Sequence, residues 1–374
     1  MKGVGKSMLS QLCRANQIFR MDRPIEKSCT RCEAFQQGGL LEIAIPASRC
    51  CHDAEGSCIM CNYGSGAPIQ SRTALESQFD AHISAVGSDL KTLILCTNGS
   101  FLDDRNVPSD IQESLMRRAQ TSVASTIIIE THVDTLSAEK LRVVRQNIPS
   151  KEIILELGLE SADPFVQKNC YLKEIPLAQL SAVMDHAQQA GFLFQLNVIL
   201  GAPFLSVSEQ MDDAERAIRW ALDHHALAAL FPMNIKPYTL LQYAYSKGLY
   251  TPISHWAMPL LLSRFSSGEL ARIDLAWFGN RQIEYDTAEI TTIFPRDCPQ
   301  CSQLLQDFYQ SYVLTADGAE RHALVDRILS VGSASCDCMT KERAAQNSGS
   351  GFRENRVLEL HKLLEAELQH DQYV

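Results

Sequence analysis

One loop decides the fold of this chain: Ser48-Arg49-Cys50-Cys51-His52-Asp53-Ala54-Glu55-Gly56-Ser57-Cys58-Ile59-Met60-Cys61-Asn62-Tyr63-Gly64. It follows an apolar run, residues 40–45, that is typical of a buried strand. Two residues separate Cys58 from Cys61, and the next cysteine upstream is Cys51 or Cys50. Three thiolates on one short loop suit an iron–sulfur cluster, because each iron takes a sulfur ligand. Three ligands for four irons leave one iron open to a substrate or cofactor; the alternatives are a zinc knuckle or buried thiols.

Composition sets the size and class of the protein. The chain has 374 residues, of which 45% are hydrophobic, and this is enough for one large domain with a smaller appendage. The formal net charge is −10 and the sequence pI is about 5.5. The chain therefore lacks, overall, the basic footprint that binding to nucleic-acid phosphates requires.

The cysteine count indicates the compartment. There are 13 cysteines, and we expect neither a signal peptide nor a membrane span, since no apolar run approaches roughly 18 residues. Many cysteines without secretion indicate metal binding in a reducing compartment instead of a disulfide framework. We therefore expect a cytoplasmic protein that does not associate with a membrane.

Short apolar runs alternate with amphipathic stretches over most of the chain. Strand followed by helix, repeated about six times, predicts an α/β fold with a parallel sheet and covering helices. In such folds the chemistry gathers at the carboxyl ends of the strands. The runs are residues 40–45, 92–96, 125–129, 153–157, 193–200 and 227–231. The predicted helices include residues 110–119, 136–146, 177–190 and 207–224.

The cysteine loop resembles the cluster loop of the radical S-adenosylmethionine enzymes. More narrowly, it is similar to the branch that holds the archaeosine synthase radical subunit and the Elongator catalytic subunit, which lengthens the gap between the first two cysteines. The branch pattern Cys-Thr-Met-Cys-Gly-Tyr matches Cys58-Ile59-Met60-Cys61-Asn62-Tyr63 except at Ile59 and Asn62. A seven-residue gap favours Cys50 over Cys51 as the first ligand. The resemblance covers roughly residues 40 to 260.

The resemblance implies a fold and an activity. The fold would be a partial (β/α)6 barrel, and the open iron of a 4Fe-4S cluster would bind S-adenosylmethionine. A reductant such as flavodoxin or ferredoxin would supply the electron that cleaves this cofactor. The resulting 5′-deoxyadenosyl radical would remove hydrogen from the substrate. Met60 would pack near the adenine.

Asn98-Gly99-Ser100 follows the second run. By itself it is a turn signal, and glycine lets backbone groups approach a ligand closely. It resembles the Ser-Gly-Ser-Phe pattern of the archaeosine branch. That resemblance implies that its backbone binds the amino group of the cofactor.

Acidic residues end the third and fourth runs. Glu130 could accept hydrogen bonds from a cationic or hydroxyl-bearing ligand, or it could be a solvated loop acid. Gly158-Leu159-Glu160-Ser161 resembles a Gly-Leu-Glu-Ser motif of the family, so we expect Glu160 and Ser161 to contact the cofactor and Glu130 and Glu160 to be catalytic. A buried glutamate such as Glu156 or Glu160 needs a partner, for instance a sulfonium, an ammonium or a ribose hydroxyl. Lys173 occupies the place of a family lysine, but an exposed helix lysine is an equal interpretation.

Gln195 and Asn197 lie two residues apart in the fifth run. Alternate residues of a strand share a face, so both would point to the same side of the sheet, and if that side is the barrel interior, both are candidate contacts of the cofactor or substrate. The family often has lysine near the position of Gln195, so the substrate contact differs here.

The C-terminal part carries a second cysteine group, Cys298, Cys301, Cys336 and Cys338. Two close pairs across a connecting segment are typical of a structural tetrahedral site, for which zinc is the first expectation and a second iron–sulfur cluster the alternative. Cys29 and Cys32 could form half of another metal site. The tail from Phe352 onward predicts one amphipathic helix.

Together these patterns predict an N-terminal extension (1–39), a radical S-adenosylmethionine barrel (40–260) and a C-terminal extension (261–374). The expected substrate is a small molecule or a peptide. A tRNA substrate, as in archaeosine synthesis, is the alternative, and an acidic chain does not favour it. A non-catalytic iron–sulfur and zinc scaffold is a further alternative.

Overall fold

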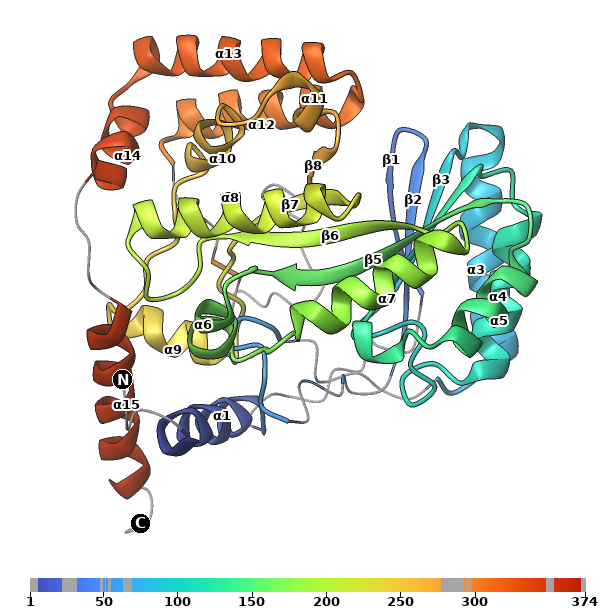
Figure 1. Cartoon of the computed structure of the whole chain (residues 1–374), viewed down its shortest axis with the longest axis horizontal. Coiled ribbons are helices and arrows are strands. Elements are labelled where there is room, and N and C mark those ends of the chain that lie inside the picture. The colour runs from blue at the N-terminus through green and yellow to red at the C-terminus, as the bar shows by residue number, and fades with distance from the viewer. Residues whose placement is uncertain are drawn as a thin grey trace.

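The computed structural model describes residues 6–21, 32–47, 50, 52, 55–62, 69–276, 292–293, 295, 297–347 and 353–370. Eight strands form one curled sheet in chain order, with β1 and β8 at its edges (Figure 1). β1 and β2 are antiparallel, and every later neighbouring pair is parallel. The strands are β1 Glu33–Gln37, β2 Leu40–Ile45, β3 Thr92–Thr97, β4 Thr126–Thr131, β5 Glu152–Glu160, β6 Leu193–Leu200, β7 Leu227–Pro232 and β8 Ile273–Leu275.

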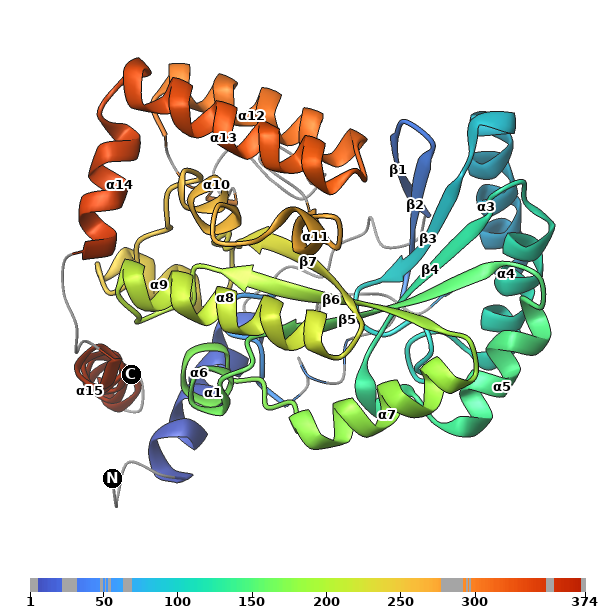
Figure 2. The same ribbon diagram turned by 45° about the horizontal axis from the view of Figure 1, so that its top comes forward.

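Helices between the parallel strands cover the convex face of the sheet (Figure 2). Ser71, Ser137 and Ser206 each cap the start of one of them by accepting a backbone hydrogen bond from the first turn. The covering helices are α3 Arg72–Val86, α4 Ser109–Thr121, α5 Ala138–Asn147, α7 Leu177–Gln189 and α8 Val207–Asp223. Short elements in the connections are η2 Gly87–Asp89, η3 Val133–Thr135, α6 Pro164–Val166, η4 Gln167–Tyr171, α9 Leu240–Ser246, α10 Ala257–Leu262 and α11 Ser267–Leu270.

The strand pattern separates the core from the concave face. Ile153, Leu155 and Leu157 of β5 are fully or almost fully buried in the main hydrophobic core beneath the helices. The residues between them, Ile154 and Glu156, therefore point to the concave face, because side chains alternate along a strand. The same alternation places polar side chains of neighbouring strands together inside the barrel.

A second hydrophobic cluster lies where the cysteine loop meets the terminal helices α1 Lys6–Met21 and α15 Arg353–His370. Leu12 of α1, Ile59 of the loop and Leu360 of α15 are buried in it. The two helices lie side by side (Figure 1), and Gln11 hydrogen-bonds to Glu365 and His361. Residues 353–370 therefore form the predicted helix, which packs on α1.

The remaining C-terminal helices, α12 Pro299–Leu314, α13 Gly318–Ser335 and α14 Cys338–Asn347, form a layer next to α10 and α11 (Figure 1). Tyr312 of α12 donates a 2.9 Å hydrogen bond to the carbonyl of Ile273 in β8. Arg321 of α13 donates to the carbonyls of Leu270 and Ile273 and pairs with Asp274. These contacts hold β8 at the edge of the sheet.

The expected α/β fold, with a partial parallel barrel and a cysteine group in its C-terminal extension, is confirmed. All six predicted runs are strands, β2 to β7. The sheet also contains β1 and β8. Among the described residues, no helix combines the length and apolar character that crossing a membrane would need.

Candidate functional site

The cysteine loop is held by helix α1. Arg20 donates hydrogen bonds to the carbonyls of Ser57 at 2.6 Å, Cys58 at 2.6 Å and Cys61 at 3.1 Å. Asn16 donates to the carbonyl of Gly56 at 2.9 Å. These bonds fix the backbone of the turn that presents two of the predicted cluster ligands.

Gly56 is required by this packing. Its φ is +79°, and a Cβ there would lie 2.5 Å from the carbonyl oxygen of Cys13 in α1. The loop also pairs with a later segment, because the amides of Cys58 and Ile59 donate to the carbonyls of Leu172 and Tyr171. The cysteine loop therefore lies between α1 and the segment that leads to Lys173.

Three of the predicted cluster ligands are described: Cys50, Cys58 and Cys61. Cys50 and Cys58 are buried, and Cys61 is half-buried. Burial raises the pKa of the Cys58 thiol to about 12, and the positive charge of Lys173 opposes this increase. Cys51, the other predicted first ligand, lies outside the described residues.

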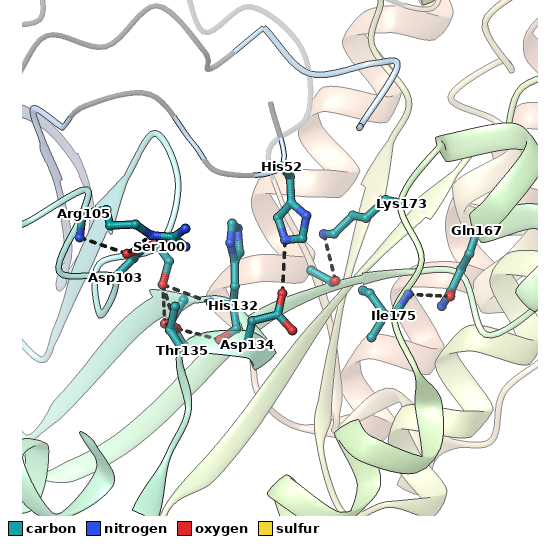
Figure 3. A network of polar contacts seen from close by, with 12 residues as sticks. His52, Ser100, Asp103, Arg105, His132, Asp134, Thr135, Gln167, Lys173 and Ile175 are labelled. Carbon is teal, nitrogen blue, oxygen red and sulfur yellow. Dashed lines mark hydrogen bonds and ion pairs between the residues drawn. The ribbon is translucent and has the colours of Figure 1, made fainter. Parts of the chain in front are cut away.

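The predicted cofactor loop, Asn98-Gly99-Ser100, lies directly against the cysteine loop. A Cβ at Gly99 would be 2.3 Å from Nδ2 of Asn106 and 3.5 Å from the Cα of Cys50. The hydroxyl of Ser100 lies 2.7 Å from Oγ1 of Thr131 and accepts a 3.2 Å hydrogen bond from the amide of His132 (Figure 3). Ser100 thus joins the end of β3 to the end of β4, and its neighbour Gly99 has its backbone close to Cys50.

Glu160 has a partner within the protein. Its Oε1 lies 2.7 Å from Nζ of Lys173, and Lys173 also donates to the carbonyl of Gly158 at 3.1 Å (Figure 3 draws the lysine). Burial disfavours the charge of Lys173, but Glu160 and the thiols of Cys58 and Cys50 outweigh this effect and raise its pKa. Lys173 is only 7% exposed, so the interpretation of this residue as an exposed lysine on a helix is wrong.

Ser161 is fully buried and makes structural contacts. Its hydroxyl donates a 2.7 Å hydrogen bond to Oδ1 of Asp213 in α8 and accepts one from the amide of Asp163. The side chain therefore joins β5 to α8. A contact with the cofactor remains a prediction for Glu160 and Ser161.

Glu130 and Glu156 occupy directly paired positions on β4 and β5, and Gln195 is paired with Glu156 on β6. Burial, together with the charges of Glu156 and Glu42, raises the pKa of Glu130 well above its usual range. Burial also raises the pKa of Glu156 to about 7, while hydrogen bonds from Asn197 and Gln195 limit the shift. Gln195 and Asn197 therefore share the face of β6 that points toward Glu156, and their contact with a cofactor stays a prediction.

The acidic set extends across the concave face. Glu42 of β2 and Asp274 of β8 both act on the carboxyl of Glu156, and the positive charge of Lys236 acts on Glu130. The carboxyl groups of Glu42, Glu130 and Glu156 and two side-chain amides are therefore grouped inside the barrel, whereas Asp274 on the edge strand pairs with Arg321. A buried group of acids favours either protons or a cationic ligand.

No known family model matches the chain. An uncharacterized protein of Methanocaldococcus jannaschii is 20% identical over 295 residues, which cover 76% of this chain and 78% of that protein. Archaeosine synthase subunit beta of Methanosarcina acetivorans is 21% identical over 246 residues, which cover 65% of each. The structure of Elp3 from Methanocaldococcus infernus, with an N-terminal deletion, has a TM-score of 0.49 and 12% identity, covering 75% of this chain and 65% of that one.

The resemblance to radical S-adenosylmethionine enzymes is confirmed. The structure brings together the loops that carry the resembled motifs. Cys50 lies near Gly99, and Cys58 lies near Lys173. Met60 is half-buried beside the second hydrophobic cluster. Cys32 is buried in the main core, and Cys29 lies outside the described residues.

A small pocket next to these loops contains residues that the radical S-adenosylmethionine motifs do not include. His52, His132 and Asp134 line it together with Lys173, among others. Figure 3 shows His52 pointing between His132 and Lys173; its ring lies 4.7 Å from that of His132, and its Nε2 lies 3.8 Å from Asp134. The only sequence signal for His52 is its position directly after the cysteine pair.

The C-terminal cysteines form a second group far from this pocket in the sequence. The thiol sulfurs of Cys298, Cys301, Cys336 and Cys338 all lie within 4.8 Å of one another. Hydrogen bonds from the Cys301 thiol and the Cys338 amide lower the pKa of Cys336 to about 7. Within the described part of the chain, the N-terminal cysteines are not gathered this tightly.

Proposed function

We propose that the protein is a radical S-adenosylmethionine enzyme whose cluster is held by Cys50, Cys58 and Cys61. The observation that supports this most directly is the contact between the two predicted binding loops, with Gly99 against the Cα of Cys50. A 4Fe-4S cluster held by these three thiols would supply the electron for cleavage of S-adenosylmethionine, and the chemistry it would make available is removal of hydrogen from the substrate.

The residues present fit this cofactor pair. The three thiols supply the sulfur ligands that a cluster needs and leave one iron free. Arg20 and Lys173 bring positive charge to the Cys58 thiol, which favours its thiolate form. Gly99 leaves the backbone open for a close approach, and the buried pair of Glu160 and Lys173 lies next to the cysteine loop. We propose Cys50 as the first ligand over Cys51, because the seven-residue gap to Cys58 favours it and its Cα lies near the cofactor loop.

The concave face indicates the chemical class of the substrate. Glu42, Glu130 and Glu156 are a concentration of acids inside the barrel, where Lys236 brings an opposite charge to Glu130, while Asp274 is already paired with Arg321. A substrate that carries an ammonium, amidinium or guanidinium group would offset this charge and accept hydrogen bonds from the side-chain amides of Gln195 and Asn197 elsewhere on its structure. We therefore propose a cationic small molecule or peptide side chain as the group that enters the barrel, with Glu130 as a direct contact.

A second candidate is modification of a cationic base in tRNA. It is favoured by the two curated relatives named archaeosine synthase subunit beta. A net charge of −10 does not favour tRNA binding by this chain alone, so a partner subunit would have to supply the phosphate contacts. A non-catalytic scaffold is a third alternative, and absence of cofactor cleavage would support it.

One experiment separates the substrate classes. Anaerobically reconstituted enzyme with dithionite and S-adenosylmethionine is incubated with cell extract divided by ion exchange, and 5′-deoxyadenosine is measured by mass spectrometry. We expect stimulation by a fraction that a cation exchanger retains at neutral pH. Stimulation by the tRNA fraction, which an anion exchanger retains, would favour the second candidate. Glu130→Gln should lose the stimulation while keeping the basal formation of 5′-deoxyadenosine.

The same proposal includes a flavodoxin or ferredoxin as the reductant and a cytoplasmic location, since a cluster with an open iron needs a reducing compartment. The C-terminal cysteine group would bind a second metal.

A further inference from the structure

The geometry of the C-terminal cysteines distinguishes between the two metals considered for them. Sγ of Cys336 lies 3.8 Å from that of Cys298 and 3.0 Å from that of Cys301, and all four sulfurs lie within 4.8 Å of one another. None of the four is in a disulfide. Four sulfurs this close surround a single point in space.

A single zinc ion requires four sulfurs grouped about this closely. Zinc–sulfur bonds are about 2.3 Å long in a tetrahedral site, which places neighbouring sulfurs roughly 3.8 Å apart. In an iron–sulfur cluster the four thiolates bind to different irons, and the bridging sulfides keep these irons apart. All four thiolates of a cluster therefore cannot approach one another as these do.

The backbone around the group favours negatively charged sulfur. The amide of Cys301 donates to Sγ of Cys298 at 3.4 Å, and the amide of Cys338 donates to Sγ of Cys336 at 3.3 Å. These amides lie at the starts of α12 and α14, where helix dipoles also stabilise thiolates. Two helix starts thus converge on the same four sulfurs.

Trp256 connects the group to the core next to the barrel. Its ring is fully buried against Cys301, which is also fully buried, and its indole N–H interacts with the thiol of Cys301. A thiolate at Cys301 would accept a hydrogen bond from this N–H. Gly332 of α13 lies on the other side of the ring, since a Cβ there would be 2.3 Å from it.

We propose that Cys298, Cys301, Cys336 and Cys338 bind one tetrahedral zinc ion, and that this ion stabilises the packing of α12, α13 and α14 against Trp256. The ion joins the start of α12, the end of α13 and the start of α14. Through Tyr312 and Arg321, the first two of these helices hold β8, which carries Asp274 of the concave face. The site therefore supports the closing edge of the barrel and has no part in electron transfer.

The inference does not depend on radical chemistry, and its test separates the two metal centres. The double variant Cys58→Ser/Cys61→Ser, which lacks two of the N-terminal ligands, is exposed to iron, sulfide and zinc and then analysed for bound elements. We expect about one zinc, the content of a single four-thiolate site, and no iron. With cobalt in place of zinc, its absorption spectrum should be that of a tetrahedral cobalt–thiolate site.

The reciprocal variant is Cys336→Ser/Cys338→Ser. It should lose the zinc, keep the iron of the reconstituted N-terminal cluster, and unfold at a lower temperature. Cys170→Ser is the matched control, because Cys170 is a buried cysteine that lies outside both groups and forms no disulfide, and this variant should keep both metals. If the reciprocal variant is insoluble, the metal content of Cys58→Ser/Cys61→Ser is sufficient to identify the metal at the C-terminal cysteines.

Two results would overturn the proposal. Iron and sulfide bound by Cys58→Ser/Cys61→Ser would show an auxiliary cluster at the C-terminal cysteines. Absence of any metal from that variant, with its C-terminal thiols free or oxidised to disulfides, would show that the group is not a metal site.

Discussion

Nζ of Lys173 lies 2.7 Å from Oε1 of Glu160, and the two side chains are only 7% and 11% exposed. The pair lies over Gly158, where a Cβ would be 2.4 Å from Oε1 of Glu160 and 2.7 Å from Nζ of Lys173. The glycine of the predicted Gly-Leu-Glu-Ser motif is therefore needed to make room for this ion pair. The pair also explains how a charged glutamate is accommodated beside the cysteine loop.

Replacing one residue of the pair of Glu160 and Lys173 should lower the free energy of unfolding more than replacing both. Glu160→Gln leaves the buried cation of Lys173 without its carboxylate, which typically destabilises a protein by roughly 3–5 kcal/mol. Glu160→Gln combined with Lys173→Met should recover much of that loss in chemical unfolding. Glu139→Gln removes the exposed partner of Arg142 and should change stability little. Equal losses in the single and double variants would contradict this account of the pair.

Arg20 should control retention of the cluster. Arg20→Ala removes three hydrogen bonds to carbonyls of the cysteine loop, and an unsatisfied buried carbonyl costs about 1–3 kcal/mol. We expect less iron after reconstitution and faster loss of the cluster absorbance in the presence of a chelator. Arg14→Ala, on an exposed position of the same helix, is the control. Equal iron content and equal rates in the two variants would show that Arg20 does not hold the loop.

Gly99 should tolerate no side chain. The Cβ of Gly99→Ala would lie 2.3 Å from Nδ2 of Asn106, so either the Asn106 side chain or the cofactor loop must shift. We expect weaker binding of S-adenosylmethionine by isothermal titration, and partial recovery when Asn106→Ala is added. Gly268→Ala is the control because nothing lies within 4 Å of a Cβ at that position. Unchanged affinity in Gly99→Ala would remove this loop from the cofactor site.

Glu156 should make stability depend on pH. Its pKa is raised from 4.5 to about 7, so the folded protein holds a proton that the unfolded chain releases between these values. Stability is therefore lost as the pH rises from about 4.5 to about 7. Glu156→Gln cannot ionise, so its free energy of unfolding relative to the wild type should increase from pH 5 to pH 8 by at most about 3 kcal/mol. The difference between the melting temperatures of the two proteins, measured at both pH values, should increase in the same direction. A difference that is the same at both pH values would contradict the shifted pKa.

The sequence predicted those parts of the fold that have a strong local pattern. The apolar runs at residues 40–45 and 193–200 match β2 and β6 over their full length. β1, with the sequence Glu-Ala-Phe-Gln-Gln, has no buried alternation, and β8 is three residues long, so neither has a pattern to detect. Both strands are held in the sheet by pairing with a longer neighbouring strand.

The site was predictable where a motif marked it and not where distant segments meet. Gly99 and Glu160 belong to recognisable strand-end motifs. Arg20 and Asn16 lie about 40 residues before the loop that they hold, on a helix without any motif. The burial of Lys173, and its pairing with Glu160, depend on the turn after η4 and cannot be read from the lysine alone.

Formation of 5′-deoxyadenosine tests the central claim most directly. Anaerobically reconstituted wild-type protein, with dithionite and S-adenosylmethionine, should produce it slowly even without substrate. Cys58→Ala should produce none, because the cluster loses a ligand, while Cys170→Ala should match the wild type. Absence of 5′-deoxyadenosine from wild-type protein whose cluster is intact and reducible would contradict the assignment as a radical S-adenosylmethionine enzyme.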